Sequence, residues 1–387
     1  MEKAGCRLYV FNPDCELAIA DGGRFYMPPA NIVRMAEDLA YLPAYLGEEG
    51  DGVLVPRAVP CGFNGELGVP VRPVMEGELA DGGEGWHAEP WGRSPRMCHW
   101  LAARGMGEEW QEGWKEAYSR RTALGVLLRL REELPFVGGE VVPAVCRSLA
   151  EVHRHAGRGN WIVKAPWSSS GKGQLRLGHP FYPKADEWMG GVLKRQGYLM
   201  LERHLDKVAD FAMEFQAVGG KVEFIGWSCF ETGEHGEYLG NRVAPQEVLE
   251  AELRGFLDSR WLLALKSCLP PALQEAFPGY EGYLGVDMLV YRGEGGEMRL
   301  HPCVEINLRC NMGILALRLQ ERYLAPGAEG YFSVRFYPRG GEALAHCLQE
   351  GSRMPAVFRN NRLLGGFLPL APVEADSCFV AALHARR

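Results

Sequence analysis

The sequence lacks the features that mark several large classes of protein. None of its 387 residues lie in an apolar run near the roughly 20 residues of a membrane-spanning helix, so no membrane insertion is expected. The net charge is −7 and there is no basic block, so a nucleic-acid-binding surface is not expected either. Internal repeats and low-complexity tracts are absent. With 47% apolar and 24% charged residues, the composition is that of an ordinary globular protein.

The cysteines show no pairing pattern. There are 11 of them, an odd number, and none form a C-x-x-C pair. This favours free thiols in a reducing compartment over a disulfide framework or a zinc site. No signal peptide precedes the strand-like residues 8–11, so we expect a cytoplasmic protein.

The two familiar phosphate-binding fingerprints are also missing, although a loop of related composition is present. Residues 161–164 predict a strand that ends in Lys164, the Ser- and Gly-rich residues 165–173 follow it, and residues 174–177 predict a second strand. A P-loop would need glycine where Pro166 stands and Ser or Thr where Gly173 stands. Small residues still let backbone N–H groups approach phosphate oxygens, and Lys164 and Lys172 add positive charge. Alone, the loop fits a solvated β-turn equally well.

An acidic hairpin is the most informative feature that the chain does contain. Asp287 lies in the apolar run 285–291, Glu305 and Asn307 lie in 304–307, and the Gly-rich turn 293–297 separates the runs. Side chains alternate along a strand, so Glu305 and Asn307 share a face. Folding the hairpin about Gly295 places residue 287 opposite residue 303, so Asp287 reaches the face of Glu305 within about one residue of slippage.

These three side chains offer hard oxygen ligands of the kind that Mg²⁺ takes, with coordination positions left for phosphate oxygens. The competing interpretation is a set of polar cross-strand pairs on a solvated face. Two acids on one face with no intervening Lys or Arg repel each other unless a cation lies between them. The pattern therefore favours a magnesium site on Asp287, Glu305 and Asn307.

Elsewhere the pattern is that of alternating helices and strands. Residues 1–118 predict an α/β unit with a helix near 31–45, a strand at 52–55 and a surface loop at 77–92. Pro245 is expected to open a long helix that stops at Pro270-Pro271. The short apolar runs of residues 331–387 are expected to cap a sheet.

The order of these parts resembles the ATP-grasp superfamily over about residues 119–313. A strand ending in Lys164, a Ser/Gly loop, an apolar strand ending in Glu202, an acid at Asp210, and finally Asp287 with Glu305-x-Asn307 follow one another as in that family. The resemblance implies an α/β and α+β protein: an N-terminal α/β domain (1–118), two ATP-grasp subdomains (119–200 and 201–330), and a C-terminal segment (331–387).

The resemblance also implies a role for individual residues in binding ATP and one or two Mg²⁺ ions. Lys164 would contact the phosphates, Glu202 the adenine edge and Asp210 the ribose. Arg121 would replace a lysine of the family, with a planar fork in place of a point charge. The remaining assignments are a lid of Ser168, Ser169, Ser170, Gly171 and Lys172, an adenine hinge of Leu199, Met200 and Leu201, and a catalytic group of Lys172, Arg309 and Asn311.

The implied activity is that of an ATP- and Mg²⁺-dependent ligase, which activates a carboxylate as an acyl phosphate for attack by an amine. Its substrates would be small molecules or peptides. A kinase on the same scaffold and a non-catalytic nucleotide-binding protein are the alternatives. Asn12, Asp14 and Glu16 follow the first strand, where α/β sheets present ligand-binding loops, and they either hold the substrate or form local turns. The sequence names neither the substrates nor the oligomeric state.

Overall fold

The computed structural model describes residues 6–79, 83, 85–157, 159–168, 173–178, 183–233 and 236–386. Contacts divide the chain into two units, each built from separate stretches of sequence. The first unit takes residues 1–111, 239–249 and 309–387, and the second takes 112–238 and 250–308. The finer boundaries predicted at residues 118, 200 and 330 stay predictions.

A parallel sheet forms the N-terminal part of the first unit. Its strands are β1 (Cys6–Val10), β2 (Gly52–Val55), β3 (Arg72–Met75) and β4 (Trp86–Pro90), in the order β3-β2-β1-β4. The strand predicted at 52–55 is β2. The predicted loop at 77–92 is wrong in its second half, because β4 pairs with the whole length of β1. Its five residues alternate too little in polarity to stand out beside the Gly- and Glu-rich stretch before them.

The first unit also contains helices. They are α1 (Cys15–Asp21), α2 (Ala30–Asp38), α3 (Pro95–Ala102), α9 (Met312–Arg318) and α10 (Glu342–Arg353), and α7 (Gln246–Arg254) begins in this unit. The helix predicted near 31–45 ends early, at Asp38, and a 3₁₀ turn over Leu42–Leu46 follows. Pro43 lies in that turn and lacks the N–H that an α-helix interior needs.

Antiparallel strands make up the rest of the first unit. They are β11 (Tyr238–Val243), β14 (Glu329–Phe336), β15 (Val357–Arg359), β16 (Arg362–Pro369) and β17 (Phe379–Arg386), and they follow the order β11-β14-β17-β16-β15. Ala343 and Cys347 of α10 pack against Phe367, Val380 and Ala382. The segment expected to cap a sheet thus supplies strands and a helix with a core of their own.

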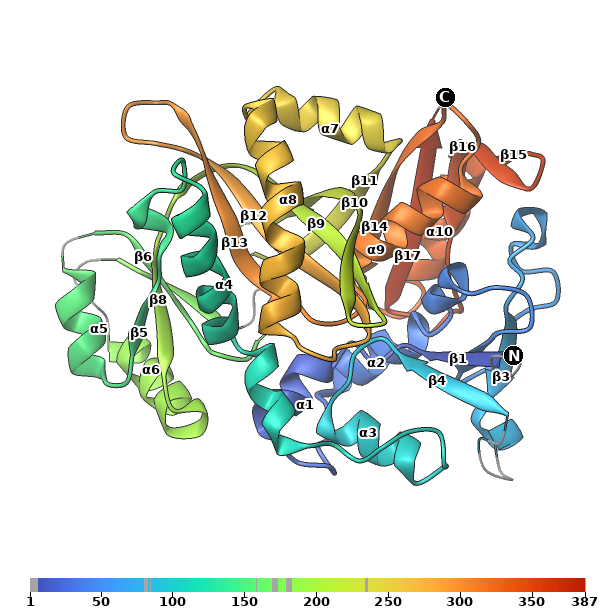
Figure 1. Cartoon of the computed structure of the whole chain (residues 1–387). Coiled ribbons are helices and arrows are strands. Elements are labelled where there is room, and N and C mark those ends of the chain that lie inside the picture. The colour runs from blue at the N-terminus through green and yellow to red at the C-terminus, as the bar shows by residue number, and fades with distance from the viewer. Residues whose placement is uncertain are drawn as a thin grey trace. The chain divides into compact units, whose positions relative to one another are not determined.

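The second unit contains a sheet with the order β5-β8-β6-β7. Its elements are β5 (Ala144–Cys146), α5 (Leu149–Ala156), β6 (Trp161–Lys164), β7 (Gln174–Leu177), α6 (Pro183–Gln196) and β8 (Leu199–Arg203). Alternate strand residues such as Val163, Leu199 and Leu201 form a core with α5 and α6, which cover one face of the sheet (Figure 1). The strands predicted at 161–164 and 174–177 are confirmed. Its other face carries the polar residues of interest.

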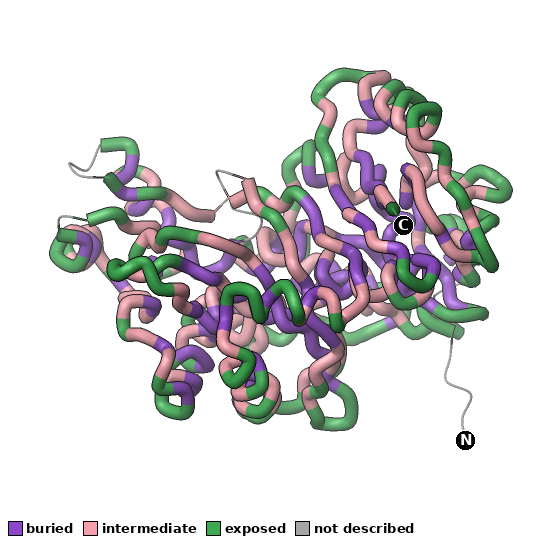
Figure 2. Tube along the Cα trace, turned by 90° about the horizontal axis from the view of Figure 1, so that it is seen from above, coloured by how far each residue is buried: buried purple, intermediate pink, exposed green. Residues whose placement is uncertain are grey.

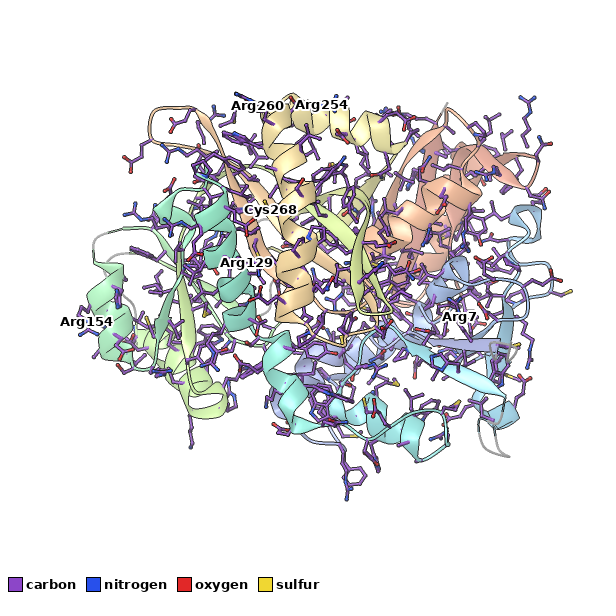
Figure 3. The ribbon with its side chains drawn as sticks, viewed as in Figure 1. Arg7, Arg129, Arg154, Arg254, Arg260 and Cys268 are labelled. Carbon is purple, nitrogen blue, oxygen red and sulfur yellow. The ribbon has the colours of Figure 1, made fainter. Side chains whose placement is uncertain are left out.

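A second, antiparallel sheet in this unit has the order β13-β12-β9-β10. Its elements are α4 (Arg120–Glu133), β9 (Asp206–Val218), β10 (Lys221–Thr232), α8 (Ser259–Ala276), β12 (Gly282–Arg292) and β13 (Met298–Asn307). The α4 and α8 helices pack together, and the Cys268 thiol of α8 has its pKa raised to about 11 by burial and by Glu133 of α4 (Figure 3). Buried residues concentrate along the strands, whereas the residues of the turns are mostly exposed (Figure 2).

The helix predicted to run from Pro245 to Pro270-Pro271 begins where expected, directly after Pro245, but it is interrupted and it ends later than predicted. It is two helices, α7 and α8, and both prolines lie inside α8. The break falls at Asp258, whose side chain accepts a hydrogen bond from the Arg260 N–H and so caps α8. Over the described ranges, no helix has the length and apolar character to cross a membrane.

Candidate functional site

The β12–β13 hairpin brings the predicted acidic residues directly opposite each other. Near the turn the pairing follows the predicted fold about Gly295, since Leu289 pairs with His301. A bulge between Asp287 and Leu289 then shifts the register, so that Asp287 pairs with Glu305 and Gly285 pairs with Asn307. Directly opposed residues of antiparallel strands share a face. The register expected from the turn was therefore off by two residues at Asp287, but the predicted common face is confirmed.

Contacts within this trio show how its charges are balanced. The Asn307 Nδ2 donates to Asp287 Oδ2 at 3.1 Å. Glu305 Oε2 accepts from Arg120 Nη2 at 2.9 Å. The cation that the two acids were expected to need is thus, in this structure, partly supplied by an arginine at the start of α4.

A buried ion pair lies on the polar face of the β5-β8-β6-β7 sheet. Lys164 Nζ donates to Glu202 Oε2 at 2.5 Å, and their side chains are only 8% and 13% exposed. The register explains the pair, because Ile162 lies opposite Glu202 and makes Lys164 its diagonal neighbour. Burial disfavours the ionised Glu202 carboxylate, but Lys164 and Arg120 outweigh it and hold the pKa of Glu202 below its usual value.

Arg120 links the predicted phosphate loop to the acidic hairpin. Its Nε donates to the carbonyl of Ala165 at 3.2 Å, and its Nη2 donates to Ser168 Oγ at 3.4 Å as well as to Glu305. The side chain is 9% exposed, and its Nη1 is buried with no hydrogen-bond partner among the residues that the structure describes. A buried guanidinium N–H without an acceptor is costly, so this atom points to an acceptor that a ligand brings.

Sequence reasoning selected Arg121 where the geometry favours Arg120. The Arg121 side chain is 45% exposed, and its Nε donates to Glu116 Oε1 at 2.7 Å. Ser119 caps α4, since its side chain accepts from the Thr122 N–H, and consecutive helix positions then project about 100° apart. A shift of one position along α4 therefore decides which of the two arginines faces the hairpin. The cap pattern was the available signal, but it did not say which face of α4 is buried.

The predicted adenine hinge lies on β8, an inner strand of its sheet. Met200 and Leu201 pair with β5 on one side and with β6 on the other, whereas Leu199 pairs with β5 and has no partner in the β6 ladder. The ladders therefore occupy both sides of the strand at Met200 and Leu201, and the hinge assignment of the three residues stays a prediction. The β5 pairing ends at Leu201, so the backbone of Glu202 and Arg203 is the first without a β5 partner.

The lid prediction is only partly visible. Ser168 is buried and accepts the hydrogen bond from Arg120. Ser169, Ser170, Gly171 and Lys172 lie outside the described residues.

Asp210 lies on the same sheet face as the acidic trio. On β9, Asp210 pairs with Leu289 and Ala212 pairs with Asp287, which places Asp210 diagonal to Asp287. Its carboxylate accepts from Lys207 Nζ at 2.6 Å and from Thr232 Oγ1 at 2.7 Å. Asp210 therefore lies on the predicted face of the sheet, and its carboxylate already accepts hydrogen bonds from two side chains.

Two buried residues of this unit were missed by sequence reasoning. Glu214 pairs with Gly285 and accepts from Ser228 Oγ at 2.8 Å. His301 is buried, and burial lowers its pKa to about 4 even though Glu202 opposes the shift. Its Nδ1 accepts from the backbone N–H of Cys303 at 3.4 Å. His301 lies four residues before Glu305, so the alternation that placed Glu305 puts His301 on the same face, and this signal was available in the sequence.

Two of the predicted catalytic residues belong to the first unit. Arg309 Nε donates to Glu16 Oε1, and both side chains are largely buried. Asn311 caps α9, with Oδ1 accepting from the Ile314 N–H at 3.0 Å. Asp14 accepts from Arg96 Nη1 at 3.1 Å. Asn12, Asp14 and Glu16 therefore make long-range contacts, and not only the local turns that were the alternative.

The donor set of the acidic trio suits a hard cation. Asp287 and Glu305 supply carboxylate oxygens from neighbouring strands, and Asn307 supplies an amide oxygen on the same face. No group of three or more His, Cys, Asp or Glu side chains is gathered for a metal within the described ranges. Two carboxylates and an amide leave open positions, as expected of an ion that also binds phosphate.

Comparisons with other proteins find similarity in structure only. No protein-family model matches the chain, and no curated protein sequence matches it. The biotin carboxylase domain of the Hydrogenobacter thermophilus 2-oxoglutarate carboxylase, solved with MgADP, ADP and bicarbonate, aligns with a TM-score of 0.56 at 12% identity, over 99% of this chain and 86% of that one.

Two further solved structures align over a similar extent. For the Campylobacter jejuni biotin carboxylase in complex with β-γ-ATP the TM-score is 0.52 at 12% identity, over 98% of this chain and 88% of that one. For the Bacillus licheniformis L-amino acid ligase it is 0.51 at 12% identity, over 99% and 94%. The chain therefore has the ATP-grasp fold.

Proposed function

We propose that this protein is an ATP- and Mg²⁺-dependent ligase that joins a carboxylate to an amine through an acyl phosphate. Arg120 is the observation that carries the proposal. It contacts Ala165 and Ser168 at the start of the Ser/Gly loop, and it contacts Glu305 in the acidic hairpin. Within the described ranges, its buried Nη1 has no hydrogen-bond partner. A triphosphate lying between loop and hairpin supplies the missing acceptor oxygen.

The nucleotide would lie along the polar faces of the two sheets. Lys164 and Arg120 neutralise phosphate charge, and the lid residues Ser168 to Lys172 close over it. Adenine meets the backbone beyond Leu201, where the β5 ladder has ended. Asp210 receives the ribose hydroxyls. The role first expected of Arg121 passes to Arg120, whose planar fork can bridge two acceptors.

Asp287, Glu305 and Asn307 would hold Mg²⁺. When bound, the ion supplies positive charge to the phosphate oxygens and orients them for transfer. Arg120 must release Glu305 to some extent for this to happen, because one of its oxygens now accepts from the guanidinium. Phosphate oxygens offer Arg120 an equivalent anionic partner, so binding of nucleotide and release of Glu305 belong together.

The chemistry divides a difficult condensation into two steps. A carboxylate oxygen attacks the γ-phosphorus, the bond from phosphorus to the β–γ bridging oxygen breaks, and ADP leaves with that electron pair. The amine nitrogen then attacks the acyl carbon, the carbon–oxygen bond breaks, phosphate leaves, and the nitrogen loses a proton. Positioning and charge neutralisation supply most of the catalysis in such transfers. A closed lid protects the acyl phosphate from water.

The setting that fits best is the cytoplasm, since all eleven cysteines carry free thiols.

The decisive experiment is a screen for ADP formation. The full-length protein is incubated with Mg²⁺, ATP and pooled amino acids, short peptides and other small carboxylates and amines, and products are identified by mass spectrometry. The expected result is ADP, phosphate and an amide that appear together, and none of them with Glu305→Gln. A stable phosphorylated product would identify a kinase instead. Stabilisation by MgATP without turnover across the screen would leave a nucleotide-binding protein, and either outcome refutes the ligase.

A further inference from the structure

The first unit holds a second group of chemistry-bearing residues, at the ends of β1 and β4. In the order β3-β2-β1-β4 the chain passes from β1 to β2 on one side, while β4 lies on the other. Ligands of open parallel sheets bind outside the carboxyl ends of the strands at such a reversal. Asn12 follows β1, and Gly92 follows β4. The Asn12 Nδ2 donates to the Gly92 carbonyl at 2.7 Å, and the Gly92 N–H donates to Asn12 Oδ1 at 3.1 Å.

Two acid–arginine pairs lie at this end of the sheet. Asp14 pairs with Arg96 of α3 at 3.1 Å, and Glu16 of α1 pairs with Arg309. The four side chains come from three separate parts of the chain, since Asp14 and Glu16 are neighbours in sequence. The Asp14 side chain is 4% exposed and that of Arg96 is 41% exposed, so the first pair runs from the interior to solvent. Burial raises the pKa of Asp14, and Arg96 only partly offsets this.

Stability alone does not account for these pairs. Desolvating two charges costs free energy that their attraction often fails to recover, and well-packed apolar side chains would do as well or better. This argument applies fully to Glu16 and Arg309 and to the buried Asp14 carboxylate, while Arg96 reaches solvent. Charges of both signs beside a strand reversal therefore suit a ligand that carries both signs of charge. When such a ligand binds, its positive group pairs with the carboxylates and its negative group pairs with the arginines, so no charge is left uncompensated.

We propose that this group binds a small zwitterion, an α-amino acid being the simplest example. Its ammonium lies between the carboxylates of Asp14 and Glu16, and its carboxylate accepts from Arg96 and Arg309. Bidentate arginine–carboxylate contacts give the orientation. This inference rests on the proposed function and names its carboxylate substrate as an amino acid.

The segment after α1 adds an apolar edge to the same group. Tyr26 lies in this segment, and burial raises the pKa of its phenol, with a smaller contribution from the Asp14 carboxylate. Phe25 lies edge-on to His99 of α3, with ring centroids 5.1 Å apart, although 70% of the Phe25 residue is exposed. Apolar side chains of an amino acid would find a surface here.

Isothermal titration of the full-length protein without nucleotide tests the site. The probes are the twenty protein amino acids, followed by the amide and the N-acetyl derivative of the best binder. At least one amino acid should bind, and both derivatives should bind at least about tenfold more weakly, since each lacks one charge. The inference is overturned if no amino acid binds, or if either derivative binds as well as its parent.

Variants then locate the site. Glu16→Gln should weaken amino acid binding about tenfold or more. Glu66→Gln, which changes an exposed acid of the same unit, should leave it unchanged. Stabilisation by MgADP is measured on the same samples, because it reports on the second unit and on folding. Equal binding by Glu16→Gln and wild type refutes the assignment. If MgADP does not stabilise the wild type, the proposed function is refuted instead. Failure of the amino acid site and failure of the proposed function are therefore distinguishable.

Discussion

Removing the Lys164 side chain should destabilise the second unit strongly, and removing its partner as well should restore much of the loss. The Lys164→Met variant leaves Glu202 about as buried as before, at 13% exposure, with its ion-pair partner gone. An uncompensated buried charge of this kind costs about 3–5 kcal/mol. In Lys164→Met/Glu202→Gln no such charge is left, and the cost should fall to about 1–2 kcal/mol.

The assay is urea unfolding monitored through hydrogen exchange of the β6 and β8 amides, because exchange reports on the stability of this sheet separately from that of the first unit. Wild type, both single variants and the double variant complete a cycle. We expect a coupling free energy of at least about 2 kcal/mol. A Lys164→Met cost below about 1 kcal/mol, or a double variant that costs as much as the sum of the singles, would refute the reasoning.

The same variant has a pH signature with a definite sign. The pKa of Glu202 is lowered in the folded protein, so its ionisation stabilises the fold above the unfolded pKa of about 4.3. That stability is lost as pH falls through the folded pKa. In Lys164→Met this contribution is gone, and the difference from wild type should shrink as pH falls below about 4. A difference that stays constant from pH 7 to pH 3 would contradict the ion-pair explanation.

Three further predictions concern the site itself. Asp287→Asn and Glu305→Gln should each lower turnover at least about a hundredfold with unchanged circular dichroism, and wild-type turnover in either would count against the metal site. Arg120→Gln should reduce stabilisation by MgADP by about 1.5–3 kcal/mol while Arg121→Gln does not, as thermal unfolding at fixed ligand would show. His301, whose folded pKa is about 4 against 6.5 for the free side chain, stays neutral in the fold, so the protein should lose stability as pH falls from 6.5 towards 4. His301→Gln should flatten that loss in pH-dependent urea unfolding, and an unchanged slope would assign the loss to other groups.

The sequence was most informative where one local pattern decides the structure. Alternation and turn residues predicted β6 and β7 at their true bounds, and they placed the acids of the hairpin on one face. Local rules failed where a tertiary contact decides. The bulge that sets Asp287 against Glu305 depends on packing around β13, and the residues of the turn do not predict it.

The choice between adjacent arginines shows the same limit. Both Arg120 and Arg121 lie in the first turn of α4, and helix propensity treats them alike. Only the position of β13 beside α4 gives Arg120 the half-buried Glu305 as its acidic partner and leaves Arg121 with Glu116. Likewise, Arg96 lies far from Asp14 in sequence, and only the parallel pairing of β1 and β4 brings their following segments together.

The bulge in β13 also gives the protein a chemical reporter of its own. Cys303 lies within the bulge, and its thiol donates to the Ala123 carbonyl of α4 at 3.6 Å. Burial raises the pKa of this thiol well above that of a free cysteine. An alkylating reagent can therefore reach it only while α4 and β13 are apart. The rate of labelling at this one sulfur measures how often the arginine on that helix loses its hold on the acidic hairpin.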